Sequence, residues 1–226
     1  MRPTVLLWDI DGTLITTGGA GRRAIERAFG ERHGRPDAFS GVNFAGMTDR
    51  AIVRAGFAAI GRECDDAEID DVLALYVRIL EDEVARAEGY SLHRGIQRAL
   101  DVTVAAGCAT GLGTGNIREG ARVKLSRVGI YARFAFGGFG CDHEDRAELI
   151  RIGARRGAEA LGAPPDECRV VVIGDTPKDI AAAKAIGAES LAVATGGYGV
   201  ADLAAHAPTW VVSDLAADGA LDPLLR

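Results

Sequence analysis

The stretch Thr4-Val5-Leu6-Leu7-Trp8-Asp9-Ile10-Asp11-Gly12-Thr13-Leu14 joins the first apolar run of the chain to its first acidic residues. The apolar run is typical of a strand that is buried on both faces of a parallel sheet. Asp9 and Asp11 would then lie at the carboxyl end of this strand, where open α/β sheets bind their ligands. Because alternate strand residues point to the same side, the spacing directs both carboxylates together, and Gly12 lets the chain turn away.

Further apolar runs alternate with helical patterns along the chain, which predicts β-α units and a parallel sheet. The clearest run covers residues 169–173 and consists almost entirely of valine and isoleucine. The other strands are expected at residues 4–8, 108–113, 134–137, 190–194 and 209–212. Helices are expected at about residues 96–106, 118–128, 146–161 and 178–186.

The alternation stops between about residues 16 and 87, where we find no convincing strand. Three helical patterns occur there instead, at residues 21–32, 49–61 and 67–87. The last has Ile69, Val72, Leu73 and further apolar residues at helical spacing. The sequence therefore predicts an all-helical insert after the first strand, with glycine-rich joints that permit hinge movement.

The composition is that of an ordinary globular protein. The 226 residues are 48% hydrophobic and 26% charged, which is enough for one substantial core or for a core with a small accessory domain. The net charge is −6 and the basic residues are scattered, so no nucleic-acid partner is expected. The N-terminal apolar run is too short for a secretory or membrane segment, which predicts a cytoplasmic protein without a membrane partner. Four widely spaced cysteines indicate neither disulfides nor a zinc site.

Two more polar clusters follow predicted strands. Gly174-Asp175-Thr176-Pro177-Lys178-Asp179 follows the valine-rich run, and its aspartates are candidates to bind or orient Mg²⁺. Gly111-Leu112-Gly113-Thr114-Gly115-Asn116 offers a hydroxyl and an amide that suit a phosphate oxygen, but it does not match a dinucleotide-binding fingerprint. Each cluster alone is also a common turn or helix cap. Their joint occurrence at the ends of three strands favours a functional site.

In this order, the three clusters resemble motifs I, II and IV of the haloacid dehalogenase superfamily, and the matching architecture covers essentially the whole chain. The helical insert resembles the mobile cap of the phosphoglycolate-phosphatase-like branch. The resemblance implies an α/β fold in which residues 1–15 and 88–226 form a Rossmann-like core. Residues 16–87 would form an inserted all-helical cap.

The resemblance also implies roles for individual residues. Asp9 would be the nucleophile and Asp11 the general acid/base. The backbone carbonyl of Asp11 would join the side chains of Asp9 and Asp175 on Mg²⁺, with Asp179 as a further ligand or an orienting group. Thr114 would bind the transferring phosphoryl group, together with Gly115 and Asn116.

The chain departs from the family pattern at the basic residue that neutralises phosphoryl charge. The region before the motif IV strand reads Asp142-His143-Glu144-Asp145-Arg146-Ala147-Glu148-Leu149 and contains no lysine. We expect Arg146 to fill this role because it opens the corresponding helix, with Lys124 as the substitute. His143 is interpreted as a surface-loop residue, because Asp11 already occupies the acid/base position.

The cap sequence contains candidates for substrate recognition. Gly19, Arg22 and Arg23 could contact an anionic substrate, although arginines on a helix of mixed charge are also commonly solvated. The segment Met47-Thr48-Asp49-Arg50 could likewise supply recognition residues or a helix N-cap.

Taken together, these features predict a Mg²⁺-dependent phosphohydrolase for a small phosphorylated metabolite. A phosphomutase shares both aspartates and is the nearest alternative. A dehalogenase has no need for the second aspartate. A non-enzymatic phospho-receiver would carry adjacent acidic residues after the first strand, and it would not explain the insert. The substrate is defined only by class, because specificity depends on cap side chains.

Overall fold

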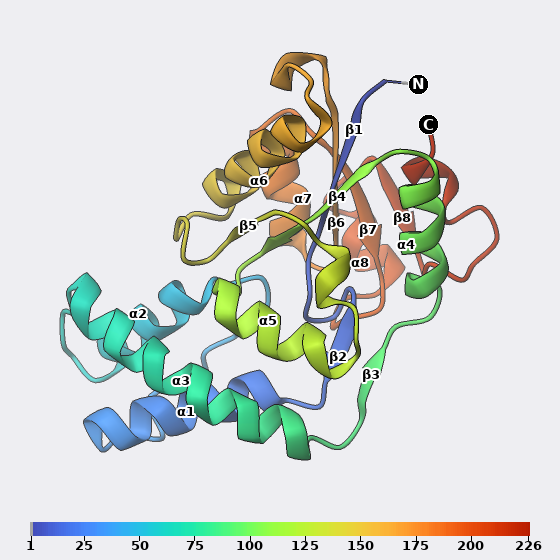
Figure 1. Ribbon diagram of the computed structural model, residues 1–226. Helices are drawn as coiled ribbons and strands as arrows, with labels where there is room; N and C mark the ends of the chain where they lie inside the picture. Colours follow the sequence, from blue (N-terminus) through green and yellow to red (C-terminus); the bar gives the residue numbers. More distant parts are fainter. Residues whose placement is uncertain (1) are drawn as a thin grey trace.

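The computed structural model describes residues 2–226 and has the predicted α/β architecture (Figure 1). Six strands form one parallel sheet in the order β5-β4-β1-β6-β7-β8, with β1 near its centre. The strands are β1 (Thr4–Trp8), β4 (Ala109–Thr114), β5 (Gly137–Phe139), β6 (Arg169–Gly174), β7 (Glu189–Val193) and β8 (Trp210–Val212).

Helices cover both faces of the sheet, and β1 shows why. Its alternate residues face opposite layers: Leu6 and Trp8 belong to an apolar cluster with α4 and α5, whereas Val5 and Leu7 pack with α6 and α7. A strand buried on both faces needs apolar residues at every position, which is the pattern seen in the sequence. The helices are α4 (Ile96–Ala105), α5 (Arg118–Arg127), α6 (Arg146–Leu161), α7 (Pro177–Ala185) and the short, unexpected α8 (Val200–Ala204).

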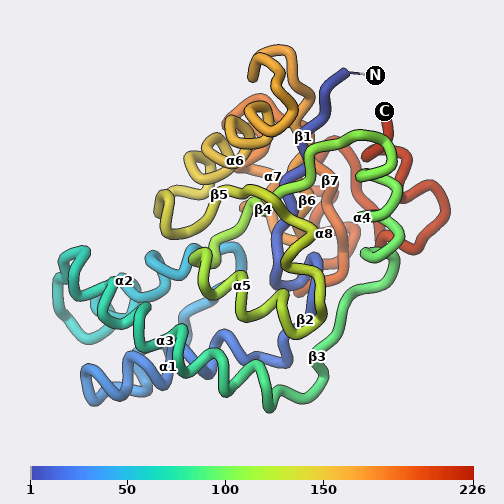
Figure 2. The backbone as a smooth tube through the Cα atoms, in the orientation of Figure 1, coloured from blue at the N-terminus to red at the C-terminus, as the bar shows by residue number. Residues whose placement is uncertain are grey.

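The insert lies beside the carboxyl ends of the central strands and next to α5 (Figure 2). It consists of α1 (Ala20–His33), α2 (Asp49–Ala59) and α3 (Asp66–Arg86), which share an apolar cluster separate from those of the sheet. Asp65 begins α3 with a capping box that includes Glu68, which satisfies backbone donors at the helix start. The three helices thus lie where the sequence predicts helical segments.

Two strands of the structure were not expected. β2 (Ile15–Thr17) and β3 (Tyr90–Leu92) pair antiparallel where the chain enters and leaves the insert. Residues 16 and 17 therefore form a strand within the stretch where the sequence predicts none. The ladder is only three residues long, so neither partner contains enough alternation to be recognised separately.

The edge strand β5 begins three residues later than expected, at Gly137 instead of residue 134. Residues Tyr131–Arg133 form a 3₁₀ turn, and the strand itself reads Gly-Gly-Phe. Gly138 lets α6 approach the sheet, since a Cβ there would lie 1.8 Å from the carbonyl oxygen of Leu149. Close helix packing therefore selects residues with poor intrinsic strand preference.

Within residues 2–226, no helix combines the length and the apolar character that crossing a bilayer requires.

Candidate active site

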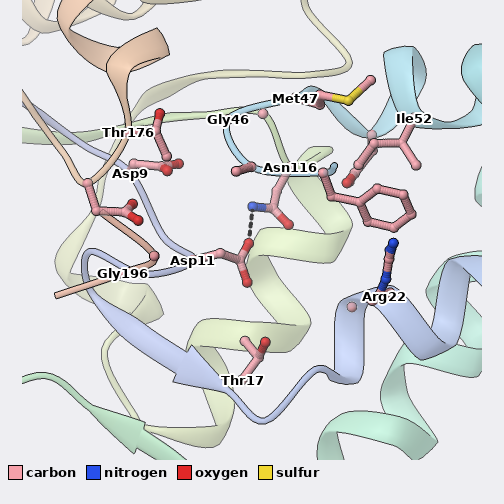
Figure 3. A pocket seen from close by; sticks show the side chains of 18 of the residues that line it. Asp9, Asp11, Thr17, Arg22, Gly46, Met47, Ile52, Asn116, Thr176 and Gly196 are labelled. Carbon is pink, nitrogen blue, oxygen red and sulfur yellow. Dashed lines mark hydrogen bonds between the residues drawn. The ribbon is translucent and has the colours of Figure 1, made fainter. Parts of the chain in front are cut away.

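The three motif loops meet at the carboxyl edge of the sheet because β4, β1 and β6 are neighbours. A cavity of about 310 Å³ lies between these loops and the insert. Figure 3 shows Asp9 and Asp11 on one side of this cavity and Met47, Ile52 and Arg22 of the insert on the other. The cavity thus combines a polar floor from the sheet with a partly apolar wall from the helices.

Asp9 and Asp11, the two motif I aspartates, lie in different environments because the chain turns tightly at Gly12. Asp9 continues the sheet by donating its backbone N–H to Ile173 over 2.9 Å, and its side chain is buried. Gly12 adopts a φ of 86°, and a Cβ there would lie 2.3 Å from Asp175 Oδ2. A side chain at this position would therefore be both strained and in collision with the site. Beyond Asp9, the side chain of Asp11 emerges into the cavity and is 41% exposed.

Arg146 connects two buried carboxylates at the start of α6. Its Nη2 lies 3.2 Å from Asp9 Oδ1 and 2.5 Å from Asp179 Oδ1, and its Nε donates to the same Asp179 oxygen over 3.0 Å. Asp145 caps the helix by accepting the N–H groups of Ala147 and Glu148, which fixes the point from which Arg146 projects. Arg146 is therefore held against Asp9, as the sequence-based placement expects.

Asp9, Asp175 and Asp179 form a buried carboxylate cluster whose ligand atoms all lie within 4.8 Å of one another. Burial, reinforced by the neighbouring carboxylates, raises the pKa of Asp175 to about 8. Burial likewise raises the pKa of Asp9 to about 6, although the charge of Arg146 opposes this shift. Three carboxylates against one guanidinium leave an excess of negative charge, which a bound cation would neutralise.

The donor set suits a small divalent metal ion. Hard carboxylate oxygens are the ligands that Mg²⁺ prefers. Both oxygens of Asp179 already accept protein donors, from Arg146 and from Thr176. Asp175 Oδ1 accepts the Thr13 hydroxyl, whereas no donor from the described chain reaches Asp175 Oδ2. The geometry therefore offers Asp9 and Asp175 to a metal and gives Asp179 an orienting position.

A different cation meets Asp11. Lys124 Nζ on α5 lies 2.6 Å from Asp11 Oδ2 and donates to Asn116 Oδ1 over 2.6 Å. Asn116 Nδ2 in turn donates to Asp11 Oδ2 over 2.8 Å (Figure 3). We call Asp11, Asn116 and Lys124 the acid–lysine cluster. Lys124 is thus brought to Asp11 and not to Asp9.

The motif II residues occupy different depths. Thr114 is fully buried, and its hydroxyl accepts the side-chain amide of Asn116 over 3.0 Å. Gly115 and Asn116 line the cavity. Gly115 also packs tightly against the insert, because a Cβ there would lie 2.2 Å from the carbonyl oxygen of Met47. The site thus exposes Gly115 and Asn116 to a ligand more directly than Thr114.

Of the predicted cap residues, two line the cavity and one points elsewhere. Gly19 and Arg22 are at the cavity wall. The Arg22 guanidinium lies 4.1 Å from the centre of the Phe44 ring and donates to the carbonyl of Val42 over 2.8 Å. Arg23 instead pairs with Glu83 at 2.8 Å. His143 is exposed and accepts the backbone N–H of Asp145, which fits the loop role expected from the sequence.

The segment Met47-Thr48-Asp49-Arg50 supplies an N-cap and a cavity residue at the start of α2. Thr48 caps α2 by accepting the N–H of Ala51. Asp49 lines the cavity and accepts the N–H of Ile117 over 2.8 Å, which ties the insert to the motif II loop. Burial raises the pKa of Asp49 to about 6, against the opposing charge of Lys124.

Sequence reasoning missed Tyr76 as a cavity residue. Tyr76 continues the apolar stripe of Ile69, Val72 and Leu73, which predicts only that it is buried; in the structure it is buried and also lines the cavity. Burial and the nearby carboxylates of Asp49 and Asp11 raise its pKa well above the ordinary value. Helical spacing identifies a buried face but does not show which member of that face meets a cavity.

Known proteins resemble this chain in sequence and in fold. A family model described as haloacid dehalogenase-like hydrolase matches residues 3–187. A phosphoglycolate phosphatase from Pseudomonas putida is 26% identical over 231 residues, which cover 98% of this chain and 81% of that protein.

Two solved structures show the same fold. A hydrolase from Pseudomonas syringae matches with a TM-score of 0.69 and 19% identity, covering 94% of each chain. CbbY from Rhodobacter sphaeroides, solved in complex with phosphate, matches with a TM-score of 0.72 and 16% identity over 98% of this chain and 100% of that one.

The family match spans most of the chain, including all three motif loops and the helical insert. The resemblance inferred from the three motifs is therefore confirmed. The chain is an enzyme of the haloacid dehalogenase-like hydrolase family.

Proposed function

We propose that this protein is a Mg²⁺-dependent phosphatase that hydrolyses small phosphate monoesters through an aspartyl-phosphate on Asp9. The main support is that the two motif I aspartates have different surroundings. Asp9 lies in a buried carboxylate cluster beside Arg146, whereas Asp11 faces the cavity. One carboxylate is thus suited to attack phosphorus, and the other is suited to exchange protons with a leaving group or with water.

Two displacements make up the reaction. In the first, a carboxylate oxygen of Asp9 forms a bond to phosphorus while the ester P–O bond breaks, and protonated Asp11 gives its proton to the departing alkoxide. In the second, Asp11 accepts a proton from water as the water oxygen bonds to phosphorus. The acyl phosphate bond then breaks, which returns Asp9 as a carboxylate and releases inorganic phosphate.

Arg146 is proposed to carry the charge-neutralising role of the missing lysine. Its guanidinium bridges Asp9 and Asp179, so it restrains the nucleophile and directs positive charge to the position of the phosphoryl group. Burial opposes its charged form, but the carboxylates of Asp179 and Asp9 outweigh this effect and raise the pKa of Arg146. Arg146 therefore stays charged throughout the reaction.

Asp9, Asp175 and the backbone carbonyl of Asp11 are proposed to hold Mg²⁺, with Asp179 orienting Arg146 and Thr176. When bound, the ion would offset the repulsion between the carboxylates and the phosphate dianion. The raised pKa values of Asp9 and Asp175 support this assignment.

The phosphoryl oxygens are proposed to meet Gly115 and Asn116, with Thr114 supporting them from below. Arg22 and Gly19 would contact the remainder of the substrate, and Arg23, which is paired with Glu83, would not. The phosphoglycolate phosphatase relative and the size of the cavity support a small phosphorylated metabolite as substrate. The proposed cap of residues 16–87 would close over it against the core of residues 1–15 and 88–226, which excludes bulk water.

Phosphate release by the purified protein tests this proposal. We expect hydrolysis of p-nitrophenyl phosphate and of a panel of small phosphate monoesters with Mg²⁺, and loss of hydrolysis with EDTA. Turnover that is insensitive to EDTA would contradict the metal requirement. A stable phosphoprotein without turnover would indicate a receiver, and isomerised sugar phosphate without free phosphate would indicate a mutase.

A further inference from the structure

Within the acid–lysine cluster, Lys124 has no role in the reaction described above, although it contacts both Asp11 and Asn116. We propose that Lys124, together with Asn116, is a positioning residue that fixes one oxygen of the Asp11 carboxylate and leaves the other free for proton transfer. The inference rests on the proposed function, because Lys124 would act through the proton transfers that Asp11 carries out in that reaction.

The hydrogen bonds distinguish the two oxygens of Asp11. Oδ2 accepts from Lys124 Nζ at 2.6 Å and from Asn116 Nδ2 at 2.8 Å. No hydrogen bond from residues 2–226 reaches Oδ1. The carboxylate is therefore held at one oxygen by two donors from different side chains, which fixes its rotation and directs Oδ1 into the cavity.

Lys124 is itself placed rigidly. Its side chain is only 4% exposed, although an unpaired buried ammonium is costly. The helix is anchored at this residue because the Tyr90 hydroxyl donates to the Lys124 carbonyl over 2.7 Å. Gly21 provides the space for the ammonium group, since a Cβ there would lie 3.1 Å from Nζ. Lys124 is thus supported by β3, by α1 and by the motif loops, unlike a flexible lysine on the surface.

The contacts also separate Lys124 from the phosphoryl-binding role. Asp9 has its own cation in Arg146, and no ion pair in the described chain joins Lys124 to Asp9, Asp175 or Asp179. The second carboxylate near Lys124 is Asp49 of the insert, whose charge Lys124 also stabilises. Lys124 therefore contacts Asp11 and influences Asp49 through its charge, away from the carboxylate cluster of Asp9.

Lys124→Met tests the inference because it keeps the length of the side chain and removes its donors. Poor alkoxide leaving groups need a proton from Asp11, whereas p-nitrophenolate hardly does. We expect hydrolysis of an alkyl phosphate to fall about tenfold, less than the roughly 10²- to 10⁴-fold contribution of a whole general acid–base group, because Asp11 itself remains. The pre-steady-state release of p-nitrophenolate should change less than about threefold, as measured by stopped-flow absorbance. Equal losses for both substrates would overturn the inference.

A double-mutant cycle separates positioning from direct contact with the phosphoryl group. The measured quantity is the decay of phosphoenzyme after substrate removal, followed by mass spectrometry. If Lys124 acts through Asp11, Lys124→Met should slow this decay in the wild-type background but cause no further loss in Asp11→Asn. If the fold-losses in decay rate of the two single variants instead multiply in the double variant, Lys124 acts independently of Asp11 and the inference is overturned.

Matched variants keep the result interpretable. Lys184→Met removes another helical lysine, which donates to the carbonyl of His206 on the surface, and should leave both substrates unaffected. Asn116→Ala removes the second donor to Asp11 Oδ2. Because Asn116 is also proposed to contact the phosphoryl oxygens, it should lower hydrolysis of both substrates, with the larger loss for the alkyl phosphate. This inequality decides the question if Lys124→Met does not fold. A crystal structure of the Lys124→Met protein should show the Asp11 carboxylate rotated, and an unchanged carboxylate would contradict the inference.

The activity of the wild-type protein distinguishes the two hypotheses. Wild-type protein without Mg²⁺-dependent phosphatase activity would overturn the proposed function as well, whereas active wild type with equal losses overturns this inference alone.

Discussion

Asp9 and Asp11 are two residues apart in one motif, yet the structure surrounds them differently. Asp9 is buried beside a guanidinium from α6 and two further carboxylates, whereas Asp11 is half-exposed beside an ammonium from α5 and an amide. The two cations come from helices on opposite faces of the sheet. A short motif can thus place two identical side chains, but the helices around the sheet decide what each one is able to do.

The largest expected effect separates the two aspartates directly. Asp9→Asn should lower kcat by about 10⁴-fold or more, because the amide cannot form the acyl phosphate. Asp11→Asn should lower alkyl phosphate hydrolysis by about 10² to 10⁴-fold but largely spare the first step with p-nitrophenyl phosphate. Steady-state and stopped-flow assays check both, with circular dichroism as the control for folding. Substantial activity in Asp9→Asn would contradict the nucleophile assignment.

The next largest effect concerns the two cations, Arg146 and Lys124. Arg146→Ala should lower kcat by about a hundredfold for aryl and alkyl phosphates alike, because phosphoryl charge develops with either leaving group. Arg146→Lys should recover only part of this loss, because an ammonium cannot reproduce the planar contact to Asp9 and Asp179. Lys124→Ala should cost clearly less with aryl substrates. The reverse ranking would mean that the family's basic residue has moved to α5.

The buried carboxylate cluster should also make stability depend on pH and on metal. The folded-state pKa values of Asp175 and Asp9, about 8 and about 6, exceed the ordinary value of 3.8. Folding therefore favours their protonated forms, and the stability they contribute is present below about pH 4 and is lost as the pH rises towards 8. Mg²⁺, which binds the ionised carboxylates, should raise the Tm more at about pH 8 than at about pH 5.

Differential scanning fluorimetry with and without Mg²⁺ measures this dependence. Asp175→Asn is the control, because it should reduce both the pH dependence and the response to Mg²⁺. An equal Mg²⁺ shift at both pH values, or an unchanged shift in Asp175→Asn, would argue against the proposed ligands.

The smallest expected effect concerns the contact between the insert and the core. Arg54 of α2 pairs with Glu144 at 3.0 Å, and both side chains are partly exposed. Such a pair contributes about 0.2 to 1 kcal/mol, so Arg54→Ala should raise KM by no more than a few-fold and leave kcat nearly unchanged. Asp49→Ala should raise KM more, because Asp49 is buried and holds Ile117. Similar KM values for the two variants would contradict this distinction.

The sequence predicts most of the fold because the strands that matter are continuous apolar runs. β1 and the helix α6 have the expected bounds, and β6 extends only one residue further. The sequence is least informative where tertiary contacts select poor strand formers. Gly138 is in β5 because α6 lies close, and Ile15–Thr17 forms a strand only because residues 90–92 pair with it.

The sequence groups the motif residues but not their partners. The sequence predicts each motif at the carboxyl end of a strand, and the three loops converge because β4, β1 and β6 are neighbours in the sheet. Chain position places Arg146 beside the nucleophile, where the structure has it, but it does not show that Lys124 meets Asp11, since this depends on how α5 is rotated against the sheet. The sequence offers Asp49 only as one of several recognition or capping residues and gives no sign that Tyr76 meets a cavity, because the packing of the insert on the motif II loop is not encoded locally.

The most direct test of the division between Asp9 and Asp11 is to locate the phosphoryl group during turnover. The enzyme is mixed with Mg²⁺ and p-nitrophenyl phosphate, quenched in acid within one turnover, digested and examined by mass spectrometry. We predict one phosphorylated peptide with the modification on Asp9, accumulating in Asp11→Asn and absent from Asp9→Asn. A phosphoryl group on Asp11 or Asp175, or rapid turnover in Asp11→Asn with no phosphoenzyme at any time, would contradict the account.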